Sequence, residues 1–281
     1  NMISKFAIQA FLARSATPGP TMAAFHAAFT CYYAMVSATE VCVPLGISYI
    51  KSRADVFHVV GFMALVLTLP MAVVAITVFT PVGDWMYGEA FGLSKRAVAE
   101  ARMTSGILML SAPILLARGT AFALLMMNRR TLFITASTLV RLSSLVGSLF
   151  IWPLFVEGAA IGAAALVTCM AAETLFAWCF AWRLYLALPL SAPKQRYALL
   201  WRFTWPLALN HSAEMGTDFI INLCMGRLND AELALAAFGM AHSVAGLLMA
   251  PLRNLAQTAQ TLVARRSDVT VLLHFSTHMV A

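Results

Sequence analysis

The chain has 281 residues, of which 61% are hydrophobic and only 11% charged, and its mean hydropathy is +0.81. A soluble domain is closer to half apolar and a quarter charged, so this composition excludes an ordinary soluble protein and indicates a multi-pass membrane protein. The formal net charge of +7 is therefore assigned to loop charges that orient helices, and not to a nucleic-acid-binding surface.

Apolar runs follow one another along the chain, and most are long enough for a helix to cross a bilayer, which takes about 20 residues. We expect helices at 2–13, 21–50, 56–80, 104–127, 131–155, 159–188, 199–226 and 231–263, with an amphipathic loop at 81–102 and a polar linker at 191–196. Such long runs argue against a β-barrel, whose strands are short and alternating. The predicted fold class is an all-α integral membrane bundle.

The expected span at 21–50 carries a polar face. His26, Thr30, Tyr33, Ser37 and Glu40 follow one another at steps of four, three, four and three residues. This spacing places side chains on one side of a helix. The pattern predicts a helix that lines a water-filled path or packs on a polar partner, because a polar face is unfavourable in contact with lipid.

The beginning of the chain is repeated further along it. Residues 1–62 align without a gap on residues 214–275, an offset of 213, with twelve identical pairs. The repeat predicts an N-terminal lobe at 1–190 with six spans and the beginning of a second lobe at 191–281. Position 1 then aligns inside the span at 199–226, so we expect an incomplete first helix and a chain that is a fragment of a longer protein.

The basic residues are distributed unevenly between the two sets of loops. Ten Lys and Arg residues follow even-numbered spans and five follow odd-numbered ones. The positive-inside rule then places the even-numbered loops and the N-terminus in the cytoplasm, here of a bacterial inner membrane. Six spans return the chain to its starting side, so the two lobes form a parallel repeat, which is one design of secondary transporters.

Charged residues occupy equivalent positions near the middle of the expected bilayer. The repeat pairs Lys5 with Asp218 and Glu40 with Arg253, and the sign of the charge is reversed in each pair. An unpaired charge there costs at least about 2.5 to 3.5 kcal/mol. We therefore expect these residues to pair across the two lobes, either as ion pairs that only pack helices or as a gate of a central cavity. The polar residues Gln9 and Asn222 are equivalent too.

Further candidates lie in other spans. Arg118, Arg141 and Glu173 all belong to the first lobe and are expected to form a buried charge network, with helix packing as the alternative role. His26, His211 and His242 are candidates for proton coupling, because histidine titrates near neutral pH. No catalytic motif and no metal-ligand spacing occurs in the sequence. We expect no enzyme, metal or cofactor, and coupling to H⁺ or Na⁺.

Three segments carry a resemblance to a known family. They are Trp205-Pro-Leu-Ala-Leu, the stretch from Arg118 to the basic pair at Arg129 and Arg130, and the run from Arg141 through Trp152-Pro153 and Glu157-Gly158-Ala159 to Glu173. They resemble the MATE-like superfamily of multidrug exporters and lipid-linked oligosaccharide flippases, and within it the progressive ankylosis protein branch with its bacterial relatives.

The resemblance implies a V-shaped transporter whose central cleft is lined by spans one, two, seven and eight. An acidic residue in the first span of a lobe often handles the coupling ion in such exporters. This implies Asp218 or Glu214 in the second lobe, whereas Lys5 at the equivalent position departs from the pattern. The branch is associated with export of anions such as pyrophosphate, which Arg118, Arg141 and Arg253 would suit.

The sequence is therefore interpreted as a secondary transporter that exports a small organic or anionic solute by alternating access. Its partners would be the lipid bilayer and a small-molecule substrate, with no nucleic acid. Two alternatives remain, a flippase for a lipid-linked oligosaccharide and a non-transporting membrane scaffold. The expected transport-pathway residues are Lys5, His26, Tyr33, Glu40, Glu214, Asp218, Asn222 and Arg253.

Overall fold

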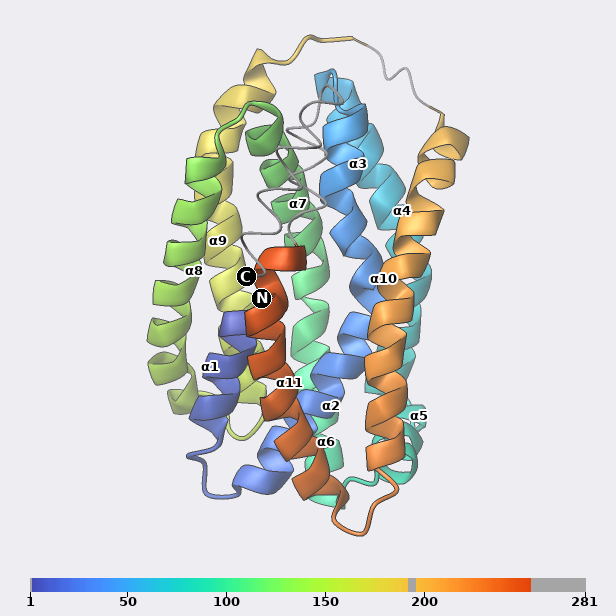
Figure 1. The fold of residues 1–281 in the computed structure, drawn as a ribbon, viewed down its shortest axis with the longest axis vertical. Helices are drawn as coiled ribbons and strands as arrows, with labels where there is room; N and C mark the ends of the chain where they lie inside the picture. Colours follow the sequence, from blue (N-terminus) through green and yellow to red (C-terminus); the bar gives the residue numbers. More distant parts are fainter. Residues whose placement is uncertain (1, 192–195, 254–281) are drawn as a thin grey trace.

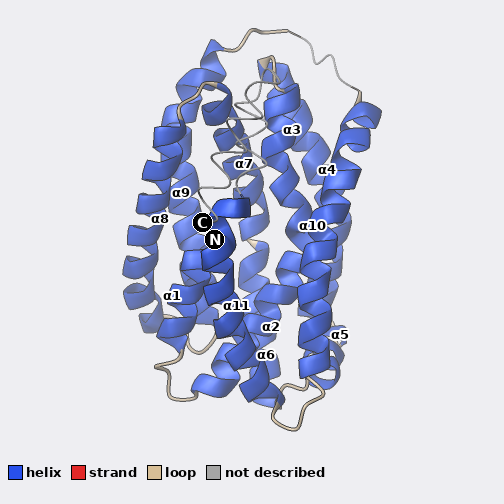
Figure 2. Ribbon diagram, in the orientation of Figure 1, coloured by secondary structure: helices blue, strands red, loops and turns tan. Residues whose placement is uncertain are grey.

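The computed structural model describes residues 2–191 and 196–253. Figure 2 shows that this part of the chain is helical and contains no strand, so the prediction of an all-helical chain is confirmed. Six helices are long and apolar enough to cross a membrane, namely Pro18–Tyr49, Arg53–Phe79, Lys95–Met127, Thr131–Leu154, Ala160–Ala187 and Ala231–Met249.

The long helices run along one axis and the turns gather at the two ends of the bundle (Figure 1). The first lobe expected from the repeat contains α1 (Met2–Leu12), α2 (Pro18–Val36), α3 (Cys42–Tyr49), α4 (Arg53–Phe79), α6 (Lys95–Met109), α7 (Ser111–Met127), α8 (Thr131–Ile151) and α9 (Ala160–Ala187). Two further helices follow, α10 (Tyr197–Met225) and α11 (Ala231–Arg253). The predicted end of the last span, at 263, lies outside the described residues.

The span expected at 21–50 is not one regular helix. A 3₁₀ segment, Ser37–Val41, separates α2 from α3. Pro44 lies in the first turn of α3, and a proline ring clashes with the carbonyl group four residues before it, here that of Glu40. The predicted span is present as Pro18–Tyr49, but it is not regular α-helix throughout, whereas Pro70 and Pro206 lie inside α4 and α10 without ending them.

The loop predicted at 81–102 is largely helical. It contains α5 (Val82–Asp84), a π-helical turn (Trp85–Ala90) and the first half of α6, which begins at Lys95. The span predicted at 104–127 is thus longer, and its regular helix is interrupted at Leu110, between α6 and α7. Pro113 explains the interruption, because its ring would clash with the carbonyl group of Met109, where α6 ends.

Glycines allow several helices of the first lobe to approach closely. A Cβ atom on Gly46 of α3 would lie 2.6 Å from Cβ of Ala123 on α7, and one on Gly119 of α7 would lie 2.9 Å from Cβ of Cys42. Small residues at helix crossings are typical of membrane proteins, in which van der Waals packing holds helices together.

The outer surface is apolar on α4 and α8. Leu69 and Phe79 of α4 are each 75% exposed, and Leu132 and Phe150 of α8 are 76% and 73% exposed. Large side chains of this kind would be unfavourable in water but match the hydrocarbon core of a bilayer. Helix α10 differs, because its 29 residues are long enough for a span but too polar to count among the six.

The last two helices pack on the first two. Helix α11 contacts α1 and α2, and α10 contacts α2 and the adjoining 3₁₀ segment. Figure 1 shows α11 lying next to α1 and α2, with α10 at the side of α2. Under the offset of 213 residues, α1 corresponds to α10 and α2 corresponds to α11. The contact of α1 with α11 is therefore equivalent to the contact of α10 with α2, and the contact of α2 with α11 lies between these two.

Candidate functional site

Eight side chains meet where α1 and α2 pack on α10 and α11. We call them the interface cluster: Lys5, Gln9, His26, Phe29, Asp218, Asn222, His242 and Ser243. Five of them are almost fully buried, with exposed fractions of 3% for Lys5, 1% for His26 and 0% for Gln9, Asn222 and Ser243. A polar group removed from water must find a partner within the protein, so the contacts of this cluster define the packing of the four helices.

Two hydrogen bonds cross between the two helix pairs. His26 Nε2 on α2 lies 2.9 Å from Asn222 Oδ1 on α10. The Ser243 hydroxyl group on α11 donates to Gln9 Oε1 on α1 at 2.7 Å. Asn222 and Gln9 are equivalent under the repeat, so each helix pair offers the same amide position to the other pair.

Two further contacts lie within the helix pairs. His242 Nε2 on α11 lies 3.3 Å from Asp218 Oδ2 on α10. Lys5 Nζ on α1 lies 4.7 Å from the centre of the Phe29 ring on α2. Adding the offset of 213 converts positions 5 and 29 into 218 and 242. The two contacts are therefore equivalent, with an ammonium group on a phenyl ring in one and a carboxylate on an imidazole ring in the other.

Lys5 and Asp218 do not form the direct ion pair expected of them, although both lie in the described part of the chain. Each is held by an aromatic ring of its own helix pair, Phe29 for Lys5 and His242 for Asp218. The two charges still interact electrostatically. The cluster thus contains one basic and one acidic group that interact electrostatically, each in contact with an aromatic ring of its own helix pair.

Buried polar atoms without a partner remain in this cluster. Gln9 Nε2 and His26 Nδ1 make no hydrogen bond within the described structure. Both face Gly239 of α11, where a Cβ atom would lie 2.7 Å from Gln9 Nε2 and 2.8 Å from His26 Nδ1. Because buried polar groups normally have partners, these two atoms could serve a polar ligand or a water molecule if the helices moved apart there.

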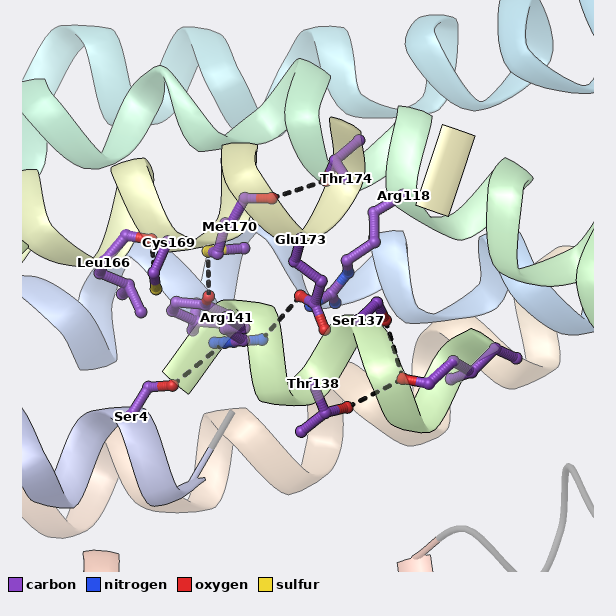
Figure 3. Close-up of polar contacts among 12 residues, drawn as sticks. Ser4, Arg118, Ser137, Thr138, Arg141, Leu166, Cys169, Met170, Glu173 and Thr174 are labelled. Atoms are coloured by element: carbon purple, nitrogen blue, oxygen red, sulfur yellow. Dashed lines mark hydrogen bonds and ion pairs between the residues drawn. The ribbon is translucent and has the colours of Figure 1, made fainter. Parts of the chain in front are cut away.

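The structure brings the three charged residues of the first lobe together (Figure 3). Glu173 Oε2 on α9 accepts from Arg118 Nη1 on α7 at 3.2 Å and from Arg141 Nη1 on α8 at 3.1 Å. Arg141 Nε also donates to the Ser4 hydroxyl group on α1 at 3.0 Å. The Arg141 and Glu173 side chains are each only 4% exposed, so four helices share one buried charge network.

The polar face expected on the second span is divided between the two sites. His26 faces α10 and α11, whereas Tyr33 donates to Met170 Sδ on α9 at 3.9 Å and interacts electrostatically with Arg141. Glu40 is half-buried in the 3₁₀ segment and interacts with Arg118. Tyr33 follows His26 by seven residues, about two turns of α2, so the two side chains meet different neighbours at different heights, and Glu40 lies beyond them in the 3₁₀ segment.

The other predicted site residues lie elsewhere on α10 or beyond the described side chains. Glu214 is exposed on α10, and His211 is half-buried on the same helix. Arg253 ends α11, but its side chain lies outside the described residues, and so does the expected Glu40–Arg253 pair.

Sequence reasoning missed Ser4 and Phe29. The offset of 213 could have indicated Phe29, because His242, already a candidate, occupies the equivalent position. Ser4 carried no such signal, since a single serine in an apolar helix usually bonds to its own backbone. Among the described residues, no group of three or more His, Cys, Asp or Glu side chains could hold a metal ion.

The interface cluster and the charge network are therefore the two buried polar sites on which a functional argument can rest. No family model, no curated protein and no solved structure matches this chain.

Proposed function

We propose that this chain is part of a secondary transporter of the MATE-like type, which moves a small organic or anionic solute by alternating access. The observation that carries the proposal is the buried interface cluster between α1–α2 and α10–α11. A polar cluster deep among apolar helices is expensive and typically marks a substrate or ion pathway.

The matched contacts of the two helix pairs support a lobe arrangement with an axis along the membrane normal. The pairs Lys5–Phe29 and Asp218–His242 are equivalent, as are the helix contacts α1–α11 and α10–α2. Two similar halves that meet at a polar boundary can rock against each other while each keeps its internal packing.

The charges at the boundary would give the pathway its chemistry. Lys5 and Asp218 are oppositely charged, and each contacts an aromatic ring of its own helix pair. A solute or a proton that binds to one of these charged groups or rings would weaken its present contact, and so would change how the two halves pack on each other. The basic loops at the end opposite the α1–α2 turn would lie in the cytoplasm of a bacterial inner membrane.

The test uses the product of the complete reading frame that encodes these residues, reconstituted in liposomes. Efflux of radiolabelled pyrophosphate and citrate is measured with and without a pH gradient. The proposal expects efflux by the wild-type protein, and a reduction of at least tenfold in Asp218→Asn but not in Glu89→Gln, which neutralises an exposed residue. Equal efflux in Asp218→Asn would remove the interface cluster from the pathway.

The same vesicles distinguish the other two interpretations. A flippase would move a fluorescent lipid-linked saccharide between leaflets while leaving both anions inside. A scaffold would move none of the three, and either result would contradict the proposed function.

A further inference from the structure

A second contact joins the α10–α11 pair to the first lobe at the end of the bundle that carries the α1–α2 and α10–α11 turns, which is the lower end in Figure 1. There, the connection between α4 and α6 meets the turn between α10 and α11. The connection belongs to the first lobe and the turn to the second copy of the repeat, so this contact crosses the same boundary as the interface cluster.

Two glycines allow the backbones to touch. A Cβ atom on Gly226, at the end of α10, would lie 2.6 Å from the carbonyl carbon and oxygen of Phe91. Gly92 has a φ of +65°, and a Cβ atom there would collide with the carbonyl oxygen of Gly226. Only glycine permits both the left-handed backbone at 92 and an approach this close.

One carboxylate ties α11 to α6. Ser94 is the N-cap residue of α6, but its own side chain makes no cap hydrogen bond. Its backbone N–H donates instead to Glu232 Oε1 at 2.9 Å, and Glu232 lies in the first turn of α11. Negative charge is favourable at a helix N-terminus, so Glu232 stabilises the N-terminal ends of two helices from the two copies at once.

The connection is held more firmly to its own lobe. Asp84 Oδ1 accepts from Arg102 Nη1 at 2.7 Å, and the Tyr87 hydroxyl group lies 2.7 Å from Ser105 Oγ. Across the boundary, by contrast, the described contacts are backbone against backbone, one hydrogen bond and an edge contact between Phe91 and Phe219. The two rings lie 5.6 Å apart between centres.

We propose that Phe91, Gly92 and Ser94, together with Gly226 and Glu232, form a latch that closes this end of the boundary and opens while each copy keeps its internal structure. Its role in transport rests on the proposed function, but its opening is measurable without any transport. Phe219 precedes the latch on α10 and follows Asp218, so opening would also displace a residue of the interface cluster.

The test measures the distance across the latch by pulsed electron paramagnetic resonance in nanodiscs. Spin labels are attached at Glu89→Cys on the connection and Asn229→Cys on the turn, after the exposed Cys179 and Cys224 are changed to Ser. We expect two distances in the otherwise unchanged protein. Glu232→Gln and Gly226→Ala should each increase the share of the longer distance several-fold.

Two matched variants control for charge and size. Glu100→Gln removes a carboxylate that accepts from the Ala159 N–H at 3.0 Å and so caps α9 within the first lobe. Gly216→Ala adds a methyl group to α10 where nothing lies within 4 Å. Both should leave the distances across the latch unchanged, and labels at 89 and 157, both in the first lobe, should give one distance throughout.

The latch proposal is contradicted if Glu232→Gln and Gly226→Ala leave the distances between labels at 89 and 229 unchanged. It is also contradicted if the two variants broaden the distance distribution between labels at 89 and 157, because the first lobe itself would then have loosened. Latch opening in a protein that moves no solute would contradict the proposed function alone. Transport by a protein whose 89–229 distance never changes would contradict the latch alone.

Discussion

Lys5 of α1 and Asp218 of α10 interact electrostatically without a direct ion pair, because Phe29 holds the ammonium group and His242 holds the carboxylate. The two residues are equivalent in the repeat and opposite in charge. Neither charge is therefore isolated in the bundle, and each depends on the other as well as on its ring.

This relationship predicts non-additive effects of neutralising the two charges. Lys5→Met and Asp218→Asn should each lower the midpoint of thermal unfolding in detergent micelles. The double variant should lose less stability than the sum, with a coupling free energy of about 0.5 to 3 kcal/mol. Lys95→Met with Glu89→Gln, two exposed residues, is the control pair and should be additive. Additivity at Lys5 and Asp218 would mean that the charges act independently.

The charge network predicts a large effect at Glu173. Glu173→Gln leaves Arg118 and Arg141 without the carboxylate that both contact. Breaking a buried ion pair by removing one partner typically costs about 3 to 5 kcal/mol. Unfolding by sodium dodecyl sulfate, followed through tryptophan fluorescence, would measure the loss. A loss no greater than that of Glu89→Gln would show that the arginines find another partner.

The α2–α11 crossing predicts opposite outcomes for two glycines. Gly239→Ala places a methyl group 2.7 Å from His26 Cγ, so it should separate the helices and destabilise the protein by about 1 to 3 kcal/mol. Gly216→Ala, with open space around it, should be neutral or stabilising, because alanine is favoured over glycine inside a helix by up to about 1 kcal/mol. Equal effects of the two variants in the same assay would argue against a close crossing at Gly239.

Much of the helical order could be predicted from hydropathy, because spans must satisfy their backbone hydrogen bonds internally. The first half of α6 could not, since Lys95, Arg96, Glu100 and Arg102 were interpreted as loop charges. These residues lie on one side of a helix whose Ala97, Val98 and Ala101 are buried. The spacing of these three apolar residues, by one and then three positions, is typical of an amphipathic helix and favours a helix over a loop.

The two sites differ in how far the sequence indicated them. Arg118, Arg141 and Glu173 were grouped correctly because charges in apolar spans need partners. The contact of Lys5 with Phe29 depends on how α1 and α2 pack, which no local pattern records. The hydrogen bond between Ser94 and Glu232 joins residues 138 positions apart, and a carboxylate early in a helix would ordinarily be assigned to that helix alone.

Tyr87 provides a test by pH, because it lies in the connection between α4 and α6. Burial raises the pKa of its phenol well above the ordinary value of about 10, so the folded protein favours the neutral form. Below about pH 10 the phenol is neutral in both states and has no pH-dependent effect. As the pH rises above about 10, the unfolded chain loses this proton first, and the free energy of unfolding should fall by up to about 1.4 kcal/mol per pH unit.

Tyr87→Phe should therefore have two opposite effects. Near neutral pH it should be less stable than the wild type by about 1 kcal/mol, because the Ser105 hydroxyl group loses its partner at 2.7 Å. Above about pH 10 it should lose stability less steeply, because the variant has no phenol to ionise there. Chemical denaturation at pH 7, 9 and 10.5 measures both, with Tyr185→Phe as the control for loss of a partly exposed phenol. An unchanged slope in Tyr87→Phe would show that ionisation of Tyr87 does not contribute to the alkaline loss of stability.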